Sequence, residues 1–408
     1  MTADHPDNLN EMLSVIADAM ADGTPLSVSG CASKSDWGYA IADARPVSVD
    51  RWAGIIDYQP DELILTVRAG TPMTEINKTL ANKNQMLGFE PPDPSVLFAK
   101  TDISNKGSIG GVLATNSSGS RRLTAGAARD FLLGFEAASG RGERFRSGGK
   151  VVKNVTGYDL SKLICGSFGT LAIMDELTLK TLPRPEVSKS VLIPATDLAA
   201  AVRHIAAILA TPHEPSAAAI LPSDIVALAS LDSSLDSSLD YGQMLAVIRF
   251  EGFAISVNDR VNAVLSLYPD GDSIDDAASQ TLWQAIGNTA LLADAAGDIW
   301  KLSCAPSAAP SVINALPDEW PLRYYADWAG GLLWLDVPTG DVTGTILRQA
   351  LADHGGGFAQ LIRDSGNTRS LVPPFQPLSS PQMALHKRIK AAFDPKGILN
   401  PGRMHHAI

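Results

Sequence analysis

Apolar residues near the start of the chain follow first a helical and then a strand-like spacing. Residues 9–20 place Met12, Leu13, Ile16 and Met20 on one helix face, which predicts an amphipathic helix. Short apolar runs separated by Gly, Pro and Asp then predict strands at 26–29, 47–49, 55–58 and 63–67.

Longer predicted elements follow, namely a helix over 74–82 and strands over 131–139 and 170–182. Thr74 is the candidate N-cap of the helix. The alternation of the last strand breaks at Asp175–Glu176, which predicts a turn or bulge there. Pro183 and Pro185 end this half, so a first domain is expected over residues 1–185.

Beyond this point the pattern changes to strand–helix–strand units. Their elements are predicted at 190–193, 198–209, 217–221, 245–253, 257–267, 331–337, 342–354 and 357–362. Such units indicate a small antiparallel sheet with helices on one face, within a second domain over 186–380. The acidic repeat LDSSLDSSLD, near residues 231–240, favours an exposed loop or a weak helix. A last helix over 381–393 begins a C-terminal segment, 381–408.

Size and composition are those of an ordinary globular protein. The 408 residues suffice for two or three domains, and 45% are hydrophobic and 19% charged. No apolar run approaches the roughly 20 residues that a membrane-spanning helix needs. The polar first ten residues, with Asp4 and Asp7, are unlike a signal peptide. We therefore expect a cytoplasmic location.

Cysteine and histidine are too scattered to predict a metal site. Cys31, Cys165 and Cys304 lie far apart without CxxC spacing, and their odd number argues against a disulfide framework. The seven histidines form no HxxxH or HExxH pattern, and His405–His406 is the single adjacent pair. No metal is expected.

Charge is distributed unevenly along the chain. The net charge of −11 argues against nucleic acid as a partner. Residues 100–190 nevertheless hold 14 Lys/Arg against 8 Asp/Glu, whereas residues 203–320 hold 4 against 15. The first region therefore suits an anion. The acidic region has two interpretations, a solubilising surface or a docking face for a partner subunit.

The segment KGSIGGVLATNSSGSRRLTAGAARD, residues 106–130, has the composition of a pyrophosphate-binding loop. Its glycines allow close backbone approach to a ligand, its Asn and Ser side chains add donors, and three arginines add positive charge. Neither GxGxxG nor GxxxxGK[ST] occurs, which excludes a Rossmann fingerprint and a P-loop. A cluster of tight turns beside a helix is the alternative interpretation.

Two further segments are weaker candidates. Residues 29–34, SGCASK, follow a short strand and could present successive amides to a phosphate or form a simple loop. Residues 154–170, NVTGYDLSKLICGSFGT, contain Gly and Asp before an apolar helix and could line a flavin or form a plain connector.

The order of these motifs, followed by FDPKGILNPGRM near the C-terminus, resembles the vanillyl-alcohol-oxidase-type (PCMH) FAD-binding family. Within it, the chain is most similar to the FAD-binding E subunits of bacterial glycolate oxidases (glycolate dehydrogenases). The likeness covers residues 25–185 and 390–404. It implies an α+β fold in which two subdomains hold FAD, followed by an α+β, ferredoxin-like cap domain and a C-terminal return segment.

The resemblance also implies the cofactor contacts. They fall on Gly30, Cys31, Ala32, Ser33, Lys34, Gly110, Gly111, Thr115, Asn116, Ser118, Gly119, Gly126, Gly157, Tyr158, Asp159 and Ile173. One departure is that Cys31 and Ala32 replace glycines of the first motif in many relatives, which narrows the pocket. Because that loop has no histidine for a covalent link, non-covalent FAD is expected.

The catalytic residues cannot be assigned from the sequence. The His-rich GDGNLH-type motif of relatives that oxidise 2-hydroxy acids is missing, and the cap histidines, His204, His213 and His354, are isolated. A substrate carboxylate could bind Arg323, Arg348 or Arg363, and Tyr324, Tyr325 and Trp328 could line a pocket or pack in the core.

The resemblance implies an FAD-binding subunit that supports oxidation of glycolate to glyoxylate. The expected partners are a second flavoprotein subunit, which could carry out the alcohol oxidation itself, and an iron–sulfur subunit that takes the electrons onward. Association with the inner face of the membrane would then run through these partners. Two alternatives stay open: a self-sufficient oxidase or dehydrogenase of another small alcohol or 2-hydroxy acid, and a scaffold subunit with an empty cradle.

Overall fold

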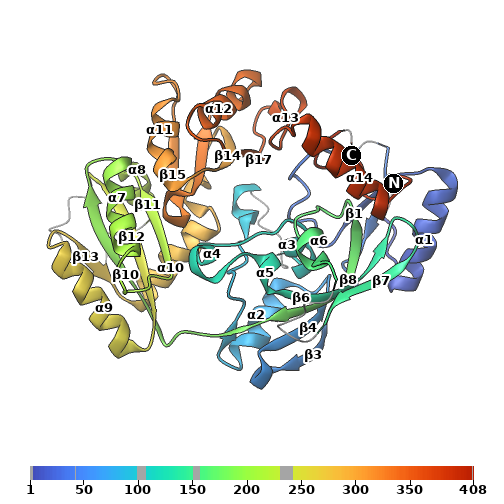
Figure 1. Cartoon of the computed structure of the whole chain (residues 1–408), viewed down its shortest axis with the longest axis horizontal. Coiled ribbons are helices and arrows are strands. Elements are labelled where there is room, and N and C mark those ends of the chain that lie inside the picture. The colour runs from blue at the N-terminus through green and yellow to red at the C-terminus, as the bar shows by residue number, and fades with distance from the viewer. Residues whose placement is uncertain (1–2, 42, 99–106, 150–156, 230–241, 407) are drawn as a thin grey trace.

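The computed structural model describes residues 3–41, 43–98, 107–149, 157–229, 242–406 and 408. The predicted loop or weak helix at 231–240 therefore lies outside the described residues. Two sheets organise the molecule, one in the N-terminal part and a larger one in the middle of the chain (Figure 1).

The N-terminal part is built on a five-stranded antiparallel sheet. Its order is β3 (Ile55–Gln59), β4 (Ile64–Arg68), β8 (Ala172–Lys180), β6 (Leu132–Ser139) and β7 (Arg144–Gly148). Its buried residues pack with those of α2 (Met73–Ala81), α3 (Ile109–Ala114), α5 (Ala128–Phe131) and α6 (Leu160–Ile164). A smaller two-stranded sheet, β5 (Gln85–Met86) and β9 (Leu182–Pro183), lies beside it.

The two central strands contain the predicted irregularity. Glu136 of β6 pairs with Glu176 of β8, and the next residue pairs with Met174, so Asp175 is left without a partner across the β6 edge. The predicted bulge is confirmed. Asp175 is 4% exposed and binds the Arg68 guanidinium at 2.6 Å, which compensates the buried carboxylate.

A second layer at the N-terminal edge of this part packs on β6 and β8 of the sheet. α1 (Leu9–Asp22) is capped by Asn8, whose side chain accepts from the amides of Asn10 and Glu11, and it ends at Gly23 in the left-handed region. It packs with β1 (Leu26–Ser29) and β2 (Arg45–Ser48), which pair in parallel. The helix predicted over 74–82 is present as α2, but its N-cap is Pro72, so the assignment of the cap to Thr74 is wrong.

The middle of the chain forms one eight-stranded antiparallel sheet. Its order is β13 (Asp272–Ile274), β10 (Val187–Ala195), β12 (Met244–Gly252), β11 (Ala217–Leu221), β15 (Arg323–Asp327), β16 (Leu332–Val337), β14 (Asp298–Ser303) and β17 (Phe358–Arg363). In each half the strands follow the order fourth, first, third, second of a ferredoxin-like βαββαβ unit. The two units join where Ile220 of β11 pairs with Ala326 of β15.

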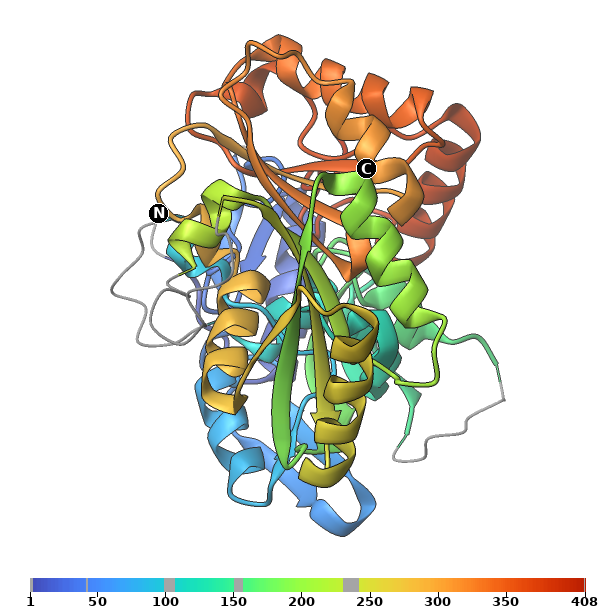
Figure 2. The same ribbon diagram turned by 90° about the vertical axis from the view of Figure 1, so that its left-hand side faces the viewer.

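Helices cover both faces of this sheet, which corrects the prediction of a small sheet covered on one side. One face packs with α7 (Leu198–Leu209), α9 (Ala254–Leu267), α11 (Ala309–Asn314) and α12 (Asp341–Asp353). The other packs with α8 (Ser223–Leu228), α10 (Asp276–Gly287) and two residues of the N-terminal part, Trp37 and Leu97. Figure 2 shows α9 and α10 on opposite sides of the strands. The second face is therefore where the two parts of the chain meet.

The chain then returns to the N-terminal part. The connecting segment includes α13 (Thr368–Leu371), and α14 (Ser380–Phe393) lies beside the first domain in Figure 1. Lys390 of α14 is buried and donates to Thr170 O, Leu399 O and Asp394 Oδ2, each at 2.7 Å. Asp394 in turn accepts from the amides of Ile398 and Leu399. This buried pair fixes the C-terminal turn against the end of β8.

Candidate functional site

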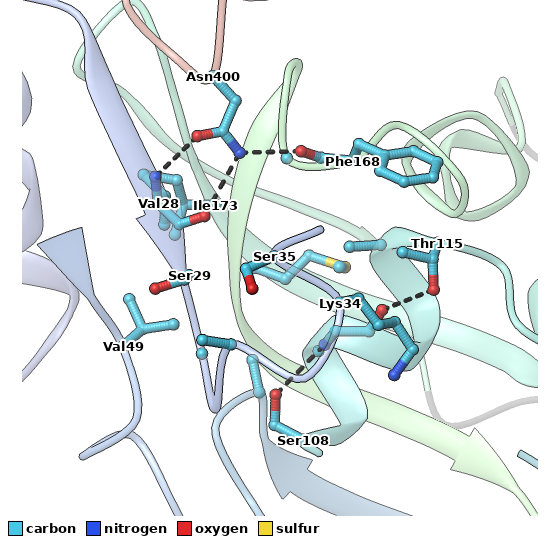
Figure 3. A pocket seen from close by; sticks show the side chains of 18 of the residues that line it. Val28, Ser29, Lys34, Ser35, Val49, Ser108, Thr115, Phe168, Ile173 and Asn400 are labelled. Carbon is cyan, nitrogen blue, oxygen red and sulfur yellow. Dashed lines mark hydrogen bonds between the residues drawn. The ribbon is translucent and has the colours of Figure 1, made fainter. Parts of the chain in front are cut away.

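A cavity of about 170 Å³, partly open to solvent, lies where β1, α3, β8 and the C-terminal tail meet. Nine of the predicted contact residues line it, namely Gly30, Cys31, Ala32, Ser33, Lys34, Gly110, Gly111, Thr115 and Ile173. Figure 3 shows Lys34, Ser108 and Thr115 around this space, with Asn400 at another edge.

The loop after β1 presents a row of free amides to this cavity. The backbone N–H groups of residues 31–34 have no acceptor among the described residues. Ala32 lies in the left-handed region, at φ 51°, between residues of ordinary conformation. A left-handed residue between residues of ordinary conformation turns successive backbone amides toward one point, which forms a concave anion-binding site. The loop is therefore suited to a phosphate oxygen.

Lys34 adds a buried positive charge to the same loop. Its side chain is 8% exposed, and no carboxylate of the described residues lies within 4 Å of its ammonium. Burial lowers the pKa of Lys34 to about 8, although the charges of Asp93 and Cys31 act in the opposite direction. An anion beside Lys34 would relieve this desolvation.

Two glycines allow close packing at this cavity, Gly30 between the loop and the start of α3, and Gly110 between α3 and the residue after β4. A Cβ atom on Gly30 would lie 2.6 Å from Ser108 Oγ, and one on Gly110 would lie 2.7 Å from Ala69 O. Ser108 caps α3 by accepting from the amide of Gly111 at 3.3 Å. Much of the wall is thus backbone and small side chains, which suits close approach of a dinucleotide.

The residues that replace glycine in the first motif both line this cavity. Cys31 is partly exposed and not disulfide-bonded, and burial raises the pKa of its thiol, as does the nearby Asp50 carboxylate. Ala32 adopts the left-handed conformation with a methyl group, which glycine would adopt without strain. The loop therefore keeps the backbone shape of a glycine-rich motif despite the two side chains.

The C-terminal tail holds this loop from behind. Asn400 accepts from Val28 N at 2.7 Å and donates to Phe168 O at 2.8 Å, so it joins β1 to the turn before β8. Arg403 donates to the carbonyls of Tyr39, Lys34 and Ser35. The motif FDPKGILNPGRM thus acts as a clamp on the amide loop, a role that its sequence alone does not reveal.

Other predicted contact residues lie away from this cavity. Asn116 accepts from Arg129 N at 3.1 Å, and Gly126, at φ 96°, faces Asp130. Gly157 lies in open space, Tyr158 is 92% exposed, and Asp159 caps α6. Their contribution to cofactor binding stays a prediction, and residues 154–156 of the third motif lie outside the described residues.

Ser118 and Gly119 line a second, much smaller cavity of about 20 Å³, which lies between the two parts of the chain. Its opposite wall comes from the eight-stranded sheet and includes Lys301 of β14 and Asp327 of β15. Neither residue is predicted from the sequence. A single lysine or aspartate within a strand gives no signal until the strands are paired.

The three arginines considered for binding a substrate carboxylate already bind other groups of the protein. Arg323 binds Asp294 at 2.9 Å. Arg348 donates to the carbonyls of Pro373 and Phe375, and Arg363 donates to those of Leu97, Ala295 and Gly297. Tyr325 is fully buried and donates to Ile286 O, whereas Trp328 lies between Arg122 and Lys301.

The described part of the chain has no group of three His, Cys, Asp or Glu side chains placed to hold a metal ion. His204 contacts the Tyr268 ring edge-on, and His354 ends α12. Among the described helices, none has the length and apolar content to cross a membrane.

Comparison with known proteins agrees with this geometry. A family model for an FAD binding domain matches residues 3–148, and one for the C-terminal domain of FAD linked oxidases matches residues 377–404. Glycolate oxidase subunit GlcE of Escherichia coli (strain K12) is 30% identical over 97% of this chain and 96% of its own length. The chain is a member of this family of FAD-linked oxidases. The resemblance predicted from the four motifs is confirmed, and the cofactor is FAD.

Three further matches have lower sequence identity to this chain than GlcE has. Glycolate oxidase subunit GlcD of Bacillus subtilis (strain 168) is 26% identical, over 86% of this chain and 77% of its own. Among solved structures, p-cresol methylhydroxylase with substrate bound matches with a TM-score of 0.71 at 15% identity, over 98% of this chain and 88% of its own. Alkyldihydroxyacetonephosphate synthase matches with a TM-score of 0.68 at 18% identity, over 97% and 76%. The predicted PCMH-type fold class is confirmed.

Proposed function

We propose that this chain is the FAD-binding subunit of a glycolate oxidase (glycolate dehydrogenase) complex. In this role it supports oxidation of glycolate to glyoxylate and passes the electrons to partner subunits. The observation that carries the proposal is the correspondence with GlcE from end to end, at 30% identity over 97% of one chain and 96% of the other.

The loop at 30–34, together with Gly110, Gly111 and Thr115, would hold the dinucleotide of FAD. The free amides and the Lys34 ammonium suit its pyrophosphate, and the small side chains of α3 suit close backbone approach. When bound, FAD supplies the two-electron acceptor that oxidation of an alcohol carbon requires. We also propose FAD contacts at the remaining predicted positions, within Asn116 to Gly126 and Gly157 to Asp159, although these residues do not line the cavity.

The partners in this proposal are a second flavoprotein subunit and an iron–sulfur subunit. The chain has three cysteines and no CxxC spacing, so an iron–sulfur cluster would belong to another chain. Within such an assembly the chain would lie in the cytoplasm, and contact with the inner face of the membrane would run through the partners.

Purification of the chain alone, and then of the native complex, tests the proposal. We expect the chain alone to take up FAD, and the complex to reduce a dye with glycolate and to contain flavin in this subunit. A colourless chain that takes up no FAD would contradict the flavin assignment and favour the scaffold alternative. Dye reduction by the isolated chain would remove the need for a second flavoprotein and favour the self-sufficient enzyme.

A further inference from the structure

The glycine-rich segment 106–130 crosses the place where the two parts of the chain meet. Trp328, directly after β15, donates its indole N–H to the carbonyl of Gly119 at 3.0 Å. The amide of Gly119 donates to Phe89 O at 2.9 Å, so both backbone groups of this residue are fixed. A Cβ atom on Gly119 would lie 2.6 Å from Glu90 O. Glycine is therefore needed at this position for close packing on Glu90.

The next residue, Ser120, is held by a buried carboxylate of the eight-stranded sheet. Its hydroxyl donates to Asp327 Oδ2 at 2.7 Å, and both residues are 2% exposed. Burial raises the pKa of Asp327 to about 6, although the bonds from Ser120 and from the amide of Trp328 act in the opposite direction. Asp327 is therefore mostly ionised at neutral pH. A charged acceptor makes this hydrogen bond stronger than one between neutral groups.

Arg121 follows, and it belongs to a network of four charges. Its backbone amide and its Nε atom donate to the two carboxylate oxygens of Glu90, each at 3.0 Å. From the other side, Arg249 of β12 donates to the same two oxygens at 3.0 and 2.9 Å. Glu251 of β12 completes the network by accepting from Arg121 Nη2. Each part of the chain thus provides one arginine and one glutamate.

The charges of this network stabilise one another. Burial lowers the pKa of Arg249, which is 3% exposed, but Glu90 and Glu251 outweigh burial and leave that pKa raised. Burial raises the pKa of Glu90, but Arg249 and Arg121 outweigh it and leave that pKa lowered. Buried ion pairs add little net stability compared with apolar packing, whereas loss of one partner leaves a buried charge uncompensated. The main effect of the network is therefore to fix the positions of the residues that it joins.

Backbone strain falls on the residues that hold this segment. Glu90 lies in the left-handed region at φ 46°, and Trp328 and Ala329 lie there at φ 51° and 60°. Such a conformation raises the energy of a residue other than glycine, so it persists where the surrounding contacts determine it. Residues 119–121 themselves have no positive φ. The strain is thus located in the support, and the supported segment is relaxed.

We propose that Arg249 and Trp328 are positioning residues for FAD, which hold residues 118–121 in the conformation that the dinucleotide requires. Neither residue lines the first cavity, so they act through Glu90 and Gly119. The inference rests on the FAD contacts proposed above for this segment. Because coupling between two binding events is reciprocal, bound FAD should in turn strengthen the contact between the two parts of the chain.

The test is titration of the FAD-free chain with FAD, followed by flavin fluorescence. Trp328→Phe removes the donor to Gly119 and keeps an aromatic ring, so FAD affinity should fall about 3- to 10-fold. Arg249→Met leaves Glu90 with one arginine partner and should weaken FAD binding about 10- to 100-fold. Arg249→Lys restores the charge without the paired hydrogen bonds, so it should recover part of the loss.

Arg323→Met is the matched control, because Arg323 lies in the same sheet, on β15, and pairs with Asp294 away from the segment. It should bind FAD as wild type does. Far-ultraviolet circular dichroism shows whether each FAD-free variant folds, and urea denaturation without FAD separates a loss of stability from a loss of affinity. Should Arg249→Met not fold, Trp328→Phe still tests the inference, because it leaves the charge network intact.

Equal FAD affinity of wild type, Trp328→Phe and folded Arg249→Met would overturn the inference, even if the variants are less stable. An equal loss of affinity in Arg323→Met would also overturn it, because the effect would then be a general one of the sheet. The titration contains no glycolate. A complex that does not oxidise glycolate would therefore contradict the proposed function and leave this inference standing.

Discussion

Two cavities of this protein, the one behind residues 30–34 and the smaller one beside Lys301, are assembled in different ways. The first is formed by a continuous loop, residues 30–34, packed on a short helix, and glycines and other small residues make up much of its wall. The second is formed by side chains such as Lys301 and Asp327 that project from separate strands toward Trp37 of the other domain. Backbone sites leave a sequence signature of small residues, whereas side-chain sites across a sheet leave none. Four predictions separate the two kinds of site, in order of expected effect.

The largest effect should come from the buried pair behind the first cavity. In Lys390→Met, Asp394 keeps a buried charge without its cation, so the free energy of unfolding should fall by about 3–5 kcal/mol. Urea denaturation followed by circular dichroism measures this. Lys396→Met, at an exposed position of the same segment, should change stability by less than about 0.5 kcal/mol. Equal effects of the two would contradict the role of the pair.

The next largest effect should come from displacement of α3 at the first cavity. Gly110→Val would push a side chain into Ala69, because even a Cβ atom at position 110 would lie 2.7 Å from the Ala69 carbonyl oxygen. Overpacking of this kind destabilises by about 1–3 kcal/mol, so FAD affinity should fall by up to about 100-fold. Flavin fluorescence titration measures it. Gly149→Ala, where a Cβ meets nothing within 4 Å, should bind FAD normally.

Lys34 should contribute a pH-dependent part of FAD binding. Its ammonium is present below about pH 8 and is lost as the pH rises, so affinity should weaken above that value. Lys34→Met should bind FAD roughly tenfold more weakly at pH 7 and should show a flatter pH profile. Lys83→Met, at an exposed position, serves as the control. An unchanged profile in Lys34→Met would assign the pH dependence to another group.

The smallest effect should appear in the second cavity, with the opposite sign. The pKa of Asp327 is about 6 in the folded protein, above its value of 3.8 when unperturbed. The folded state therefore binds more protons between these values, and stability falls as the pH rises through them. Asp327→Asn removes the buried charge but weakens the hydrogen bond from the Trp328 amide. Its net effect should be a free energy of unfolding about 1 kcal/mol higher at pH 7.5, and no increase near pH 4. Thermal unfolding at both pH values measures the difference, and a loss of stability at pH 7.5 would contradict it.

Much of the fold follows from local pattern. The helix over 198–209 and the strands at 26–29 and 217–221 match α7, β1 and β11 at both ends, because their apolar spacing is regular and turn residues flank them. The pattern gives no indication of β14 and β15, so the sheet expected from the sequence is too small. These strands contain Lys301, Arg323 and Asp327 on or near the face that meets the other domain, which interrupts the alternation of apolar residues.

The first cavity is predictable from the sequence because glycines and small residues, which form much of its wall, are visible in the sequence. Gly110 and Gly111 mark close approach, and the loop at 30–34 follows a strand whose end is clear from the sequence. The clamp by Asn400 and Arg403 is not predictable, because it depends on contacts across more than 360 positions of the chain. Ser118 and Gly119 belong to the same motif but face the second cavity, which local pattern cannot distinguish.

The clamp has a consequence for how the protein matures. Asn400 and Arg403 complete the wall behind residues 28–35, so the amide loop has its final support only after residue 403 has left the ribosome. Flavin insertion should therefore be a late, post-translational event, and a peptide tag joined directly after the C-terminal residues should slow it more than one at the N-terminus.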